Sequence, residues 1–303
     1  MPEIEAAAKA IRRGGLVVMP TETVYGLAAD ATDPEAIARV FALKGRPSDN
    51  PLIVHIGSTA TLDGIVTDVP DDAWTLVNRF WPGPLTLVLP RGPRIPDMVS
   101  AGLPSVAVRM PNHPVALALL AESERPLAAP SANRFMALSP TRAEDVAPEI
   151  RAGVHAVLDG GPCGIGIEST VLDLTGRIPR LLRPGGVGKG QLEALLGREI
   201  EARPVLQDEG ARAAPGGYRR HYSPRTPVRL VPSVAPDEAG LALSGSPTGV
   251  RLVLPSDPAG YAAVLYAALA RLDAMSVAEI AIEIPPDDPT WTAVRDRLSR
   301  MDF

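Results

Sequence analysis

Residues 15–31 read GLVVMPTETVYGLAADA, and this stretch joins an apolar strand to a polar loop. The run Leu16–Met19 is typical of a buried strand. Four side chains that can form hydrogen bonds follow where that strand should end, namely Thr21, Glu22, Thr23 and Tyr25. Open α/β folds bind ligands at strand ends that face a cleft. The stretch therefore predicts an α/β protein whose ligand lies against residues 20–31.

Length and composition restrict the class of protein. The chain has 303 residues, 46% of them hydrophobic, which gives room for two domains with an ordinary core. No apolar run reaches the roughly 18 residues of a membrane span, and MPEIEAAAKAIRRGG at the start lacks the apolar centre of a signal peptide. The single cysteine, Cys163, excludes an internal disulfide and a multi-cysteine zinc site. We expect a cytoplasmic protein that does not bind a membrane.

The net charge of -5 argues against a globally basic nucleic-acid-binding protein, although a local basic patch remains open. The sequence also contains no G-x-x-x-x-G-K-[ST] loop, no G-x-G-x-x-G after a first strand and no G-x-S-x-G elbow. No two of its four histidines have the spacing of metal ligands, and we therefore predict no protein metal site. A polyphosphate would have to be held by dispersed cations and hydroxyls.

Hydrophobic periodicity and capping residues predict the elements of the first part of the chain. Asp33 followed by Pro34 predicts the start of a helix, Asn112 predicts an N-cap, and Thr141 with Glu144 forms a capping box. The predicted helices span residues 3–13, 34–43, 113–121, a short stretch from 141, and 188–196, and the predicted strands span 16–19, 52–56, 85–89, 105–110, 154–158 and 169–174.

The pattern changes after residue 197. Residues 198–227 have neither a helix nor a strand period, which is typical of a linker. Beyond them, PVRLV, GVRLVLP and IAIEIP read as strands, and residues 261–274 and 292–301 read as amphipathic helices. We predict a first α/β domain at 1–197, a linker at 198–227, and a small Rossmann-like α/β domain at 228–303.

Lys44 and Arg46 lie two residues apart in a glycine-containing turn after a predicted helix. A lysine supplies a mobile point charge and an arginine a bidentate fork, which together suit a triphosphate. The alternative interpretation is a solvated helix C-terminus stabilised by two cations.

Hydroxyls and amides gather in two further segments. Ser131 and Asn133 follow small residues at a predicted strand end, and Ser139 precedes a predicted helix N-terminus, which is a natural anion site. Ser169 opens a strand and Arg183 lies in a strand-to-loop turn. Ordinary turn, cap and loop salt-bridge chemistry accounts for these residues equally well.

Arg109 and Ser105 share one face of the strand SVAVRMP because side chains on a strand alternate. An arginine on an apolar strand is costly unless it is paired or binds a carboxylate, so Arg109 is a candidate ligand-binding residue. His55 ends the strand LIVH, where a lone histidine is also compatible with a structural role.

Taken together, these segments resemble the YrdC-type threonylcarbamoyl-AMP synthases. The shared motifs occur in order as PTETVYGLAADA, KGRPSDNPLIVHI, FWPGPLTLVL, SVAVRMPNHP, APSANR, SPT, IESTVLDL and LRPGG, and they cover nearly all of residues 1–190. The segment APGGYRRHYSP and the C-terminal helices resemble those of the long, two-domain members. The resemblance implies that residues 1–197 form a catalytic domain with a twisted, open, mixed sheet and flanking helices. It also implies that the linker at 198–227 closes over the active site and that a small Rossmann-like domain follows.

The resemblance also implies a reaction. Bicarbonate and L-threonine would form a carbamate whose oxygen attacks the α-phosphate of ATP, giving threonylcarbamoyl-AMP, pyrophosphate and water. Mg²⁺ would accompany the ATP. The product would pass to a threonylcarbamoyl-transferase complex that forms threonylcarbamoyladenosine in tRNAs reading codons that start with adenosine. Such chemistry depends on positioning and charge stabilisation rather than on a covalent nucleophile.

By position in the family motifs, the resemblance assigns roles to individual residues. Lys44 and Arg46 would be catalytic. The implied ATP-binding residues are Lys44, Arg46, Asn50, Ser105, Ser131, Asn133, Ser139, Arg183 and Tyr222. The implied L-threonine-binding residues are Thr23, His55, Arg109, Ala129 and Ser169.

One departure from the family pattern affects the loop before Ser139. Met136 stands where the family usually has glycine, and only glycine adopts a positive φ without cost. We therefore expect the loop at 134–138 to differ.

Two other functions remain open. An RNA-binding module would show salt-dependent RNA affinity that requires Lys44 or Arg46. A carbamoyl-transfer domain of hydrogenase maturation usually lies in a longer chain with cysteine-rich zinc segments, which a single cysteine does not fit.

Overall fold

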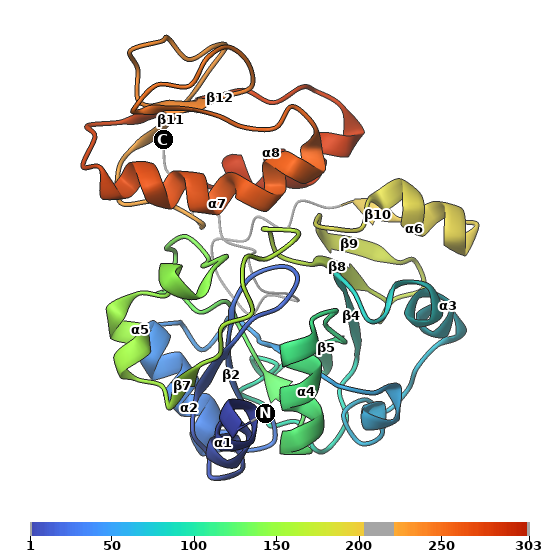
Figure 1. Cartoon of the computed structure of the whole chain (residues 1–303). Coiled ribbons are helices and arrows are strands. Elements are labelled where there is room, and N and C mark those ends of the chain that lie inside the picture. Colours follow the sequence, from blue (N-terminus) through green and yellow to red (C-terminus); the bar gives the residue numbers. More distant parts are fainter. Residues whose placement is uncertain (1, 203–220, 302–303) are drawn as a thin grey trace.

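The computed structural model describes residues 2–202 and 221–301. Within these ranges the chain forms a larger α/β unit with a ten-stranded sheet and a smaller one with a four-stranded sheet (Figure 1). No helix in the described ranges combines the length and hydropathy needed to cross a bilayer.

The sheet of the larger unit is mixed, with the strand order β10-β9-β8-β4-β5-β3-β6-β2-β1-β7. The predicted class, an open mixed α/β sheet with flanking helices, is confirmed. Its strands are β1 (Val17–Met19), β2 (Gly26–Asp30), β3 (Ile53–His55), β4 (Leu85–Pro90), β5 (Ser105–Arg109), β6 (Leu127–Ala128), β7 (Ala156–Val157), β8 (Thr170–Asp173), β9 (Arg180–Arg183) and β10 (Glu201–Ala202). Its helices are α1 (Pro2–Arg12), α2 (Pro34–Lys44), α3 (Asp71–Phe80), α4 (Pro114–Ser123), α5 (Pro148–Ala152) and α6 (Lys189–Leu196), with 3₁₀ turns η1 (Thr59–Leu62) and η2 (Ala143–Asp145).

Alternation along the strands divides the core between the two faces of this sheet. Val17 and Met19 pack with helices α1 and α4 on one face, whereas Leu16 and Val18 belong to the main core on the other. Helices α2, α3 and α6 contribute to that main core. Farther along the sheet, the face that carries Ile53 and its neighbours forms a small apolar floor, made of Ile53, Val88, Ala107, Val171 and Leu182.

Two predicted helix starts were wrong. The N-cap of α4 is His113, whose Nδ1 accepts a hydrogen bond from the Val115 amide, and not Asn112. The helix expected at Thr141 is only the three-residue turn η2, and the carboxylate that reaches back to the Thr141 and Arg142 amides is Asp145 rather than Glu144. A single 3₁₀ turn has little dipole, so the anion-site argument for Ser139 loses its basis.

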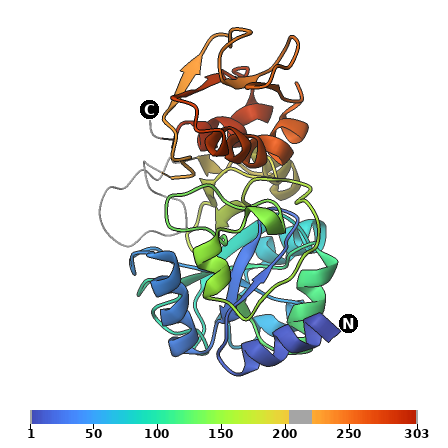
Figure 2. The ribbon, with the colours of Figure 1, turned by 60° about the vertical axis from the view of Figure 1, so that its left-hand side comes forward.

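The smaller unit has the strand order β11-β14-β12-β13, and all of its pairs are parallel. Its elements are β11 (Val228–Val231), β12 (Gly240–Ala242), β13 (Arg251–Val253), α7 (Pro258–Ala274), β14 (Ile280–Glu283), the turn η3 (Pro289–Trp291) and α8 (Thr292–Leu298). Figures 1 and 2 show α7 and α8 between the small sheet and the larger unit. The small α/β domain predicted after the linker is therefore present, and its sheet is parallel.

The predicted linker at 198–227 is described only in part. Residues 203–220 lie outside the described residues. Strand β10, within the predicted linker, pairs with β9 and so extends the large sheet. Residues 221–227 lead into β11, and the first of them contacts the segment that follows α8, where the His221 amide donates to the Arg300 carbonyl at 2.8 Å.

Candidate active site

A cavity of about 50 Å³ lies where the two units meet, and Ile53 of the apolar floor is part of its lining. Its walls come from the loop between β1 and β2, the ends of β3, β5 and β9, the start of β8, and the segment at 221–222. The predicted site residues among its lining are Thr23, Arg46, His55, Arg109, Ala129, Ser131, Ser169, Arg183 and Tyr222.

A larger cleft of about 750 Å³ opens between β9 and α8, but its lining includes none of the predicted residues. That cleft is mostly apolar, whereas three arginines and several hydroxyls converge on the smaller cavity. A few polar groups that converge on one pocket orient a bound ligand and are typical of a ligand site. The smaller cavity is therefore the candidate active site.

His55 and Arg109 are neighbours because β3 and β5 run in parallel with these two residues in register. Arg109 is buried and donates to the Thr23 hydroxyl at 2.8 Å and to the Gly83 carbonyl at 3.1 Å. Burial, followed by repulsion from Arg109, lowers the pKa of His55 to about 3, so the imidazole is neutral. The register of β3 and β5 thus places the Arg109 guanidinium beside the neutral imidazole of His55.

Arg109 was expected to bind a substrate carboxylate, but in this structure it faces a carboxylate of the chain. Its Nη2 lies 2.6 Å from Oε2 of Glu22, within ion-pair distance but outside hydrogen-bond alignment. The two oxygens of Glu22 are buried and find no hydrogen-bond partner among the described residues. A ligand carboxylate would have to share or replace this pairing.

Lys44 is placed differently from a phosphate-binding lysine. Its ammonium is buried and donates to the carbonyls of Ser131 and Asn133, each at 2.5 Å. Burial, then repulsion from Arg46 and Arg134, lowers the pKa of Lys44 well below its ordinary value. In this structure Lys44 secures the loop that carries Ser131, and it does not line the cavity.

Arg46 lines the cavity while its guanidinium organises the turn that follows. It donates to the side-chain oxygen of Asn50 at 2.5 Å and to the carbonyls of Asn50 and Pro51 at 3.1 and 2.7 Å. Asn50 is fully buried behind Arg46, so it orients that cation rather than lining the cavity.

The loop after β6 approaches the β1–β2 loop closely because small residues face each other. Gly26 bridges Ser131, and a Cβ on Gly26 would lie 3.2 Å from that of Ala129. A larger residue at position 26 would push the loop that carries Ala129 and Ser131 away from the β1–β2 loop. These small residues bring the Ser131 backbone to the cavity wall.

Ser169 and Arg183 meet where β8 pairs with β9. The Ser169 hydroxyl lies 2.7 Å from that of Thr86 and accepts from Arg183 at 3.2 Å, and Nε of Arg183 donates to the Ser169 carbonyl at 3.0 Å. Arg183 is buried, and burial lowers its pKa. The two residues therefore form one unit on the cavity wall.

Tyr222 closes the cavity from the segment that precedes β11. Its ring packs against His221 with centroids 4.1 Å apart, and the Arg297 guanidinium lies 5.2 Å from the ring centroid. Burial lowers the pKa of His221 to about 3 and raises the pKa of Tyr222. Neutral aromatic groups thus form this wall.

The remaining predicted residues do not line the cavity. Ser105 begins β5 on the same face as Arg109 but at the other end of the strand, roughly 13 Å away at about 3.3 Å per residue. The Asn133 side chain donates within its own loop, to the carbonyls of Arg134 and Ala137. The Ser139 hydroxyl donates to Glu168 at 2.7 Å.

Sequence reasoning missed several residues that belong to this site. Thr21, Glu168 and His221 line the cavity, and Arg297 and Tyr266 of the smaller unit contact Glu168. Glu168 did give a signal, because a carboxylate between Ile167 and Ser169 at a buried strand start needs a partner. Nothing nearby in the sequence indicates that this partner is Arg297.

Comparisons with known proteins cover both units. A family model described as "Telomere recombination" (Sua5/YciO/YrdC) matches residues 9–185. A second, described as "Threonylcarbamoyl-AMP synthase, C-terminal domain", matches residues 187–301.

Curated relatives and a solved structure agree with these matches. Threonylcarbamoyl-AMP synthases of Bacillus subtilis and Pyrococcus abyssi are each 48% identical over 231 residues, which is 76% of this chain. The matched region spans about two thirds of each relative, 66% and 68%. The crystal structure of P. abyssi Sua5 complexed with L-threonine aligns with a TM-score of 0.91 and 40% identity, over 99% of this chain and 95% of that one.

Proposed function

The chain belongs to the threonylcarbamoyl-AMP synthase family, and we propose that it makes threonylcarbamoyl-AMP from L-threonine, bicarbonate and ATP, releasing pyrophosphate and water. The observation that carries this proposal is the convergence of Arg46, Arg109 and Arg183 with the Thr23, Ser131 and Ser169 hydroxyls on one cavity. This set suits an amino acid and a polyphosphate held side by side.

Within this proposal the cavity has two ends. Thr23, His55 and Arg109 bind threonine together with Ser169, and Ala129 adds backbone contacts. Arg46 and Arg183 face the ATP phosphates, and Ser131 and Tyr222 lie against the nucleotide. Lys44 and Asn50 act through the loops that they hold, whereas Ser105, Asn133 and Ser139 reach ATP only if those segments shift.

The chemistry requires no nucleophile from the protein. The amino nitrogen of threonine attacks the carbon of bicarbonate, and a C–O bond breaks with release of water to give the carbamate. A carbamate oxygen then attacks the α-phosphate of ATP, and pyrophosphate leaves. Arginines preorganised in a buried site stabilise the charge that develops on phosphate oxygens. Closure of the site excludes water, which would otherwise hydrolyse the mixed anhydride.

Magnesium enters this scheme with ATP. Among the described residues no three His, Cys, Asp or Glu side chains form a group that could hold a metal. The carboxylate on the cavity wall, Glu168, is bound by an arginine. We therefore assign Mg²⁺ to the phosphates, where it would neutralise their charge.

The cavity of about 50 Å³ is far smaller than the 300–1,000 Å³ of typical small-molecule sites. Binding of ATP therefore requires its walls to separate. The product would pass to a threonylcarbamoyl-transferase complex that modifies tRNA.

Pyrophosphate release tests the proposal. The complete mixture of ATP, Mg²⁺, L-threonine and bicarbonate should release pyrophosphate, and omission of threonine or bicarbonate should abolish it. Mass spectrometry should find threonylcarbamoyl-AMP in the complete mixture alone. Equal release without threonine would contradict the proposal.

A further inference from the structure

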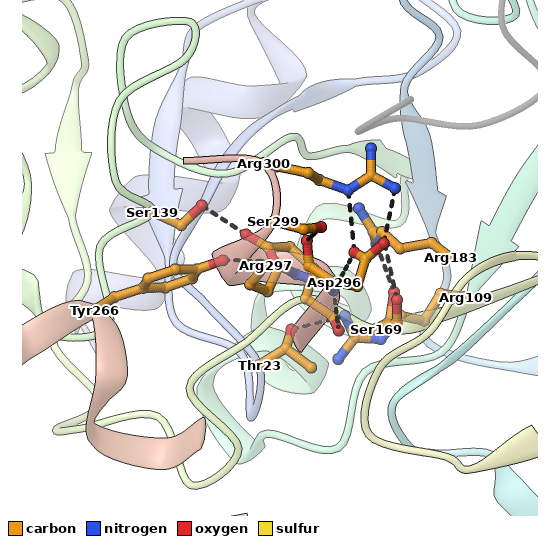
Figure 3. A network of polar contacts seen from close by, with 11 residues as sticks. Thr23, Arg109, Ser139, Ser169, Arg183, Tyr266, Asp296, Arg297, Ser299 and Arg300 are labelled. Carbon is orange, nitrogen blue, oxygen red and sulfur yellow. Dashed lines mark hydrogen bonds and ion pairs between the residues drawn. The ribbon is translucent and has the colours of Figure 1, made fainter. Parts of the chain in front are cut away.

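Glu168 connects the candidate site to the smaller unit. This residue lies on the cavity wall and directly precedes Ser169. Its Oε1 accepts from the Ser139 hydroxyl at 2.7 Å, and its Oε2 accepts from Nε of Arg297 at 2.8 Å and from the Tyr266 hydroxyl at 3.1 Å. Figure 3 shows Ser139, Tyr266 and Arg297 converging from different elements.

Two of these three donors belong to the smaller unit. Tyr266 lies on α7 and Arg297 on α8, and both are buried. Arg297 also donates to the Glu168 carbonyl at 3.3 Å, so one guanidinium holds both the side chain and the backbone of Glu168. The hydrogen bonds therefore fix the position of the peptide that leads into Ser169.

Because Glu168 and Arg297 are both buried, each of these charges needs the other as its partner. The Arg297 side chain is 0% exposed and that of Glu168 is 8% exposed. A buried charge without a partner is strongly unfavourable. Asp296 completes the arrangement, because it binds Arg297 at 2.7 Å and Arg300 at 2.8 Å. Each charge at this contact between the two units thus has a specific partner.

The pairing determines the ionisation of Glu168. Burial alone would raise the pKa of this carboxyl, but Arg297 and Arg183, with hydrogen bonds from Ser139 and Arg297, lower the pKa to about 2. An ionised carboxylate can only accept hydrogen bonds. The Ser139 hydroxyl must therefore donate to it, which leaves the oxygen lone pairs of Ser139 for another donor.

We propose that Arg297 and Tyr266 are positioning residues of the active site, which act through Glu168 on Ser139 and Ser169. The proposal rests on the proposed function, because it concerns the same substrate site. In this view the smaller unit contributes to catalysis without touching a substrate, by holding a wall of the larger unit's cavity in its active geometry.

Two substitutions test the proposal, each with a matched control on the same helix. Arg297→Gln removes the counter-charge of Glu168, whereas Arg295→Gln removes a charge paired on the surface with Asp287. Tyr266→Phe removes one hydrogen bond to Glu168, whereas Tyr261→Phe removes a buried hydroxyl for which the described residues supply no partner.

We expect Arg297→Gln to lower kcat/KM for pyrophosphate release at least tenfold and Tyr266→Phe to lower it about three- to fivefold. The two controls should stay within twofold of the unaltered protein. ATP and threonine affinities, measured by calorimetry without turnover, should fall in the same order. The affinities test the positioning role even if the protein releases no pyrophosphate. Failure of the proposed function can therefore be distinguished from failure of the positioning proposal.

A pH profile distinguishes positioning from a general loss of structure. The charged and titratable groups near Glu168 are Arg297 and Asp296 on α8, Tyr266 on α7, Arg183 on β9, and His221 and Tyr222. Without Arg297 the pKa of the Glu168 carboxyl should rise, because less positive charge opposes the effect of burial. The activity of the variant relative to that of the unaltered protein should therefore fall as the pH is lowered from 8 to 6. For Arg297→Lys, which keeps the charge, this activity ratio should not change with pH.

Two results would overturn the proposal. One is equal kcat/KM for the Arg297→Gln and Arg295→Gln proteins. The other is a loss of activity with an unchanged pH profile. If Arg297→Gln fails to fold, the comparison of Tyr266→Phe with Tyr261→Phe decides, since equal affinities and rates for these two proteins would also refute the positioning role.

Discussion

The ring of Tyr222 stacks on that of Tyr266, with centroids 5.9 Å apart and planes inclined by 23°. Tyr222 belongs to the cavity wall and Tyr266 to the core of the smaller unit, so an aromatic pair joins the two. Such pairs contribute about 0.5–1.5 kcal/mol beyond their buried area.

Tyr222→Ala should therefore weaken ATP binding about tenfold and change threonine binding less than twofold, because the ring lies at the nucleotide end of the proposed site. Tyr222→Phe keeps the stack on Tyr266 and the contact with Arg297, and should bind ATP nearly normally. Calorimetric titration with each ligand measures both effects. An equal loss of threonine affinity would place Tyr222 at the other end of the cavity.

Lys44→Met should lower thermal stability together with ATP binding. Hydrogen bonds from a charged group contribute about 1.5–3 kcal/mol, and Lys44 donates two of them to loop carbonyls. A lysine that served only to bind phosphate would leave the melting temperature unchanged or raised on substitution. Calorimetric melting of the ligand-free protein separates these two roles.

Arg46→Ala should weaken ATP binding about 10- to 100-fold, since a bidentate charged contact contributes roughly 1.5–3 kcal/mol. Arg39→Ala is the control, because Arg39 lies on the preceding helix and pairs on the surface with Asp33 and Glu35. Equal affinity of the two variants for ATP would remove Arg46 from the site.

Met136 adopts φ = 72°, the left-handed conformation in which a side chain is strained. The loop thus keeps the backbone shape that a glycine would take, and the Met136 carbonyl accepts from the Ser223 amide at 2.9 Å. A difference between this loop and that of other family members stays a prediction.

Met136→Gly should be more stable than Met136→Ala by about 1 kcal/mol, because glycine alone removes the strain. Urea unfolding of the two variants measures the difference. Greater stability of the alanine protein would show that the loop rearranges on substitution.

Acid should destabilise the fold through its buried histidines. The pKa of His55 is about 3 when folded and about 6.5 when unfolded, so the unfolded chain binds more protons between these values. The stabilisation is complete above pH 6.5 and falls as the pH is lowered, by about 2 kcal/mol at pH 5. Glu168, whose pKa is also depressed, adds to this loss only below about pH 4.5.

His55→Gln should remove its share of this pH dependence. The stability difference between the unaltered protein and the variant should shrink by about 2 kcal/mol from pH 7 to pH 5 in urea unfolding. If the stability of the His55→Gln protein depended on pH in the same way as that of the unaltered protein, the pKa of His55 would not be depressed by folding.

The sequence predicted the secondary structure best where a strand or helix depends on the residues next to it in the chain. The β-branched runs that form β3 and β5 indicated that His55 and Arg109 end two strands, and the family motifs placed both in one site. Strand β2 was missed because GLAAD has little intrinsic strand preference, and its pairing with β1 and β6 determines its conformation.

Contacts made across the whole fold were beyond sequence reasoning. Glu168 and Arg297 are 129 positions apart, and no periodicity relates them. Lysine is a residue type that often binds phosphate, which is why Lys44 was predicted to do so. The Ser131 and Asn133 carbonyls to which it donates come close to it only after the sheet has formed. Local patterns therefore indicate which residue types are available, and tertiary packing determines their partners.

The contact between Arg297 and Glu168 has a practical consequence for dissecting this protein. A fragment that ends at residue 197 would retain Arg46, Arg109 and Arg183 but would leave Glu168 facing solvent and lack His221 and Tyr222 altogether. Kinetic constants measured on such a truncated polypeptide would describe a different catalyst, and inhibitors selected against it would be shaped to a wall that the intact enzyme does not expose.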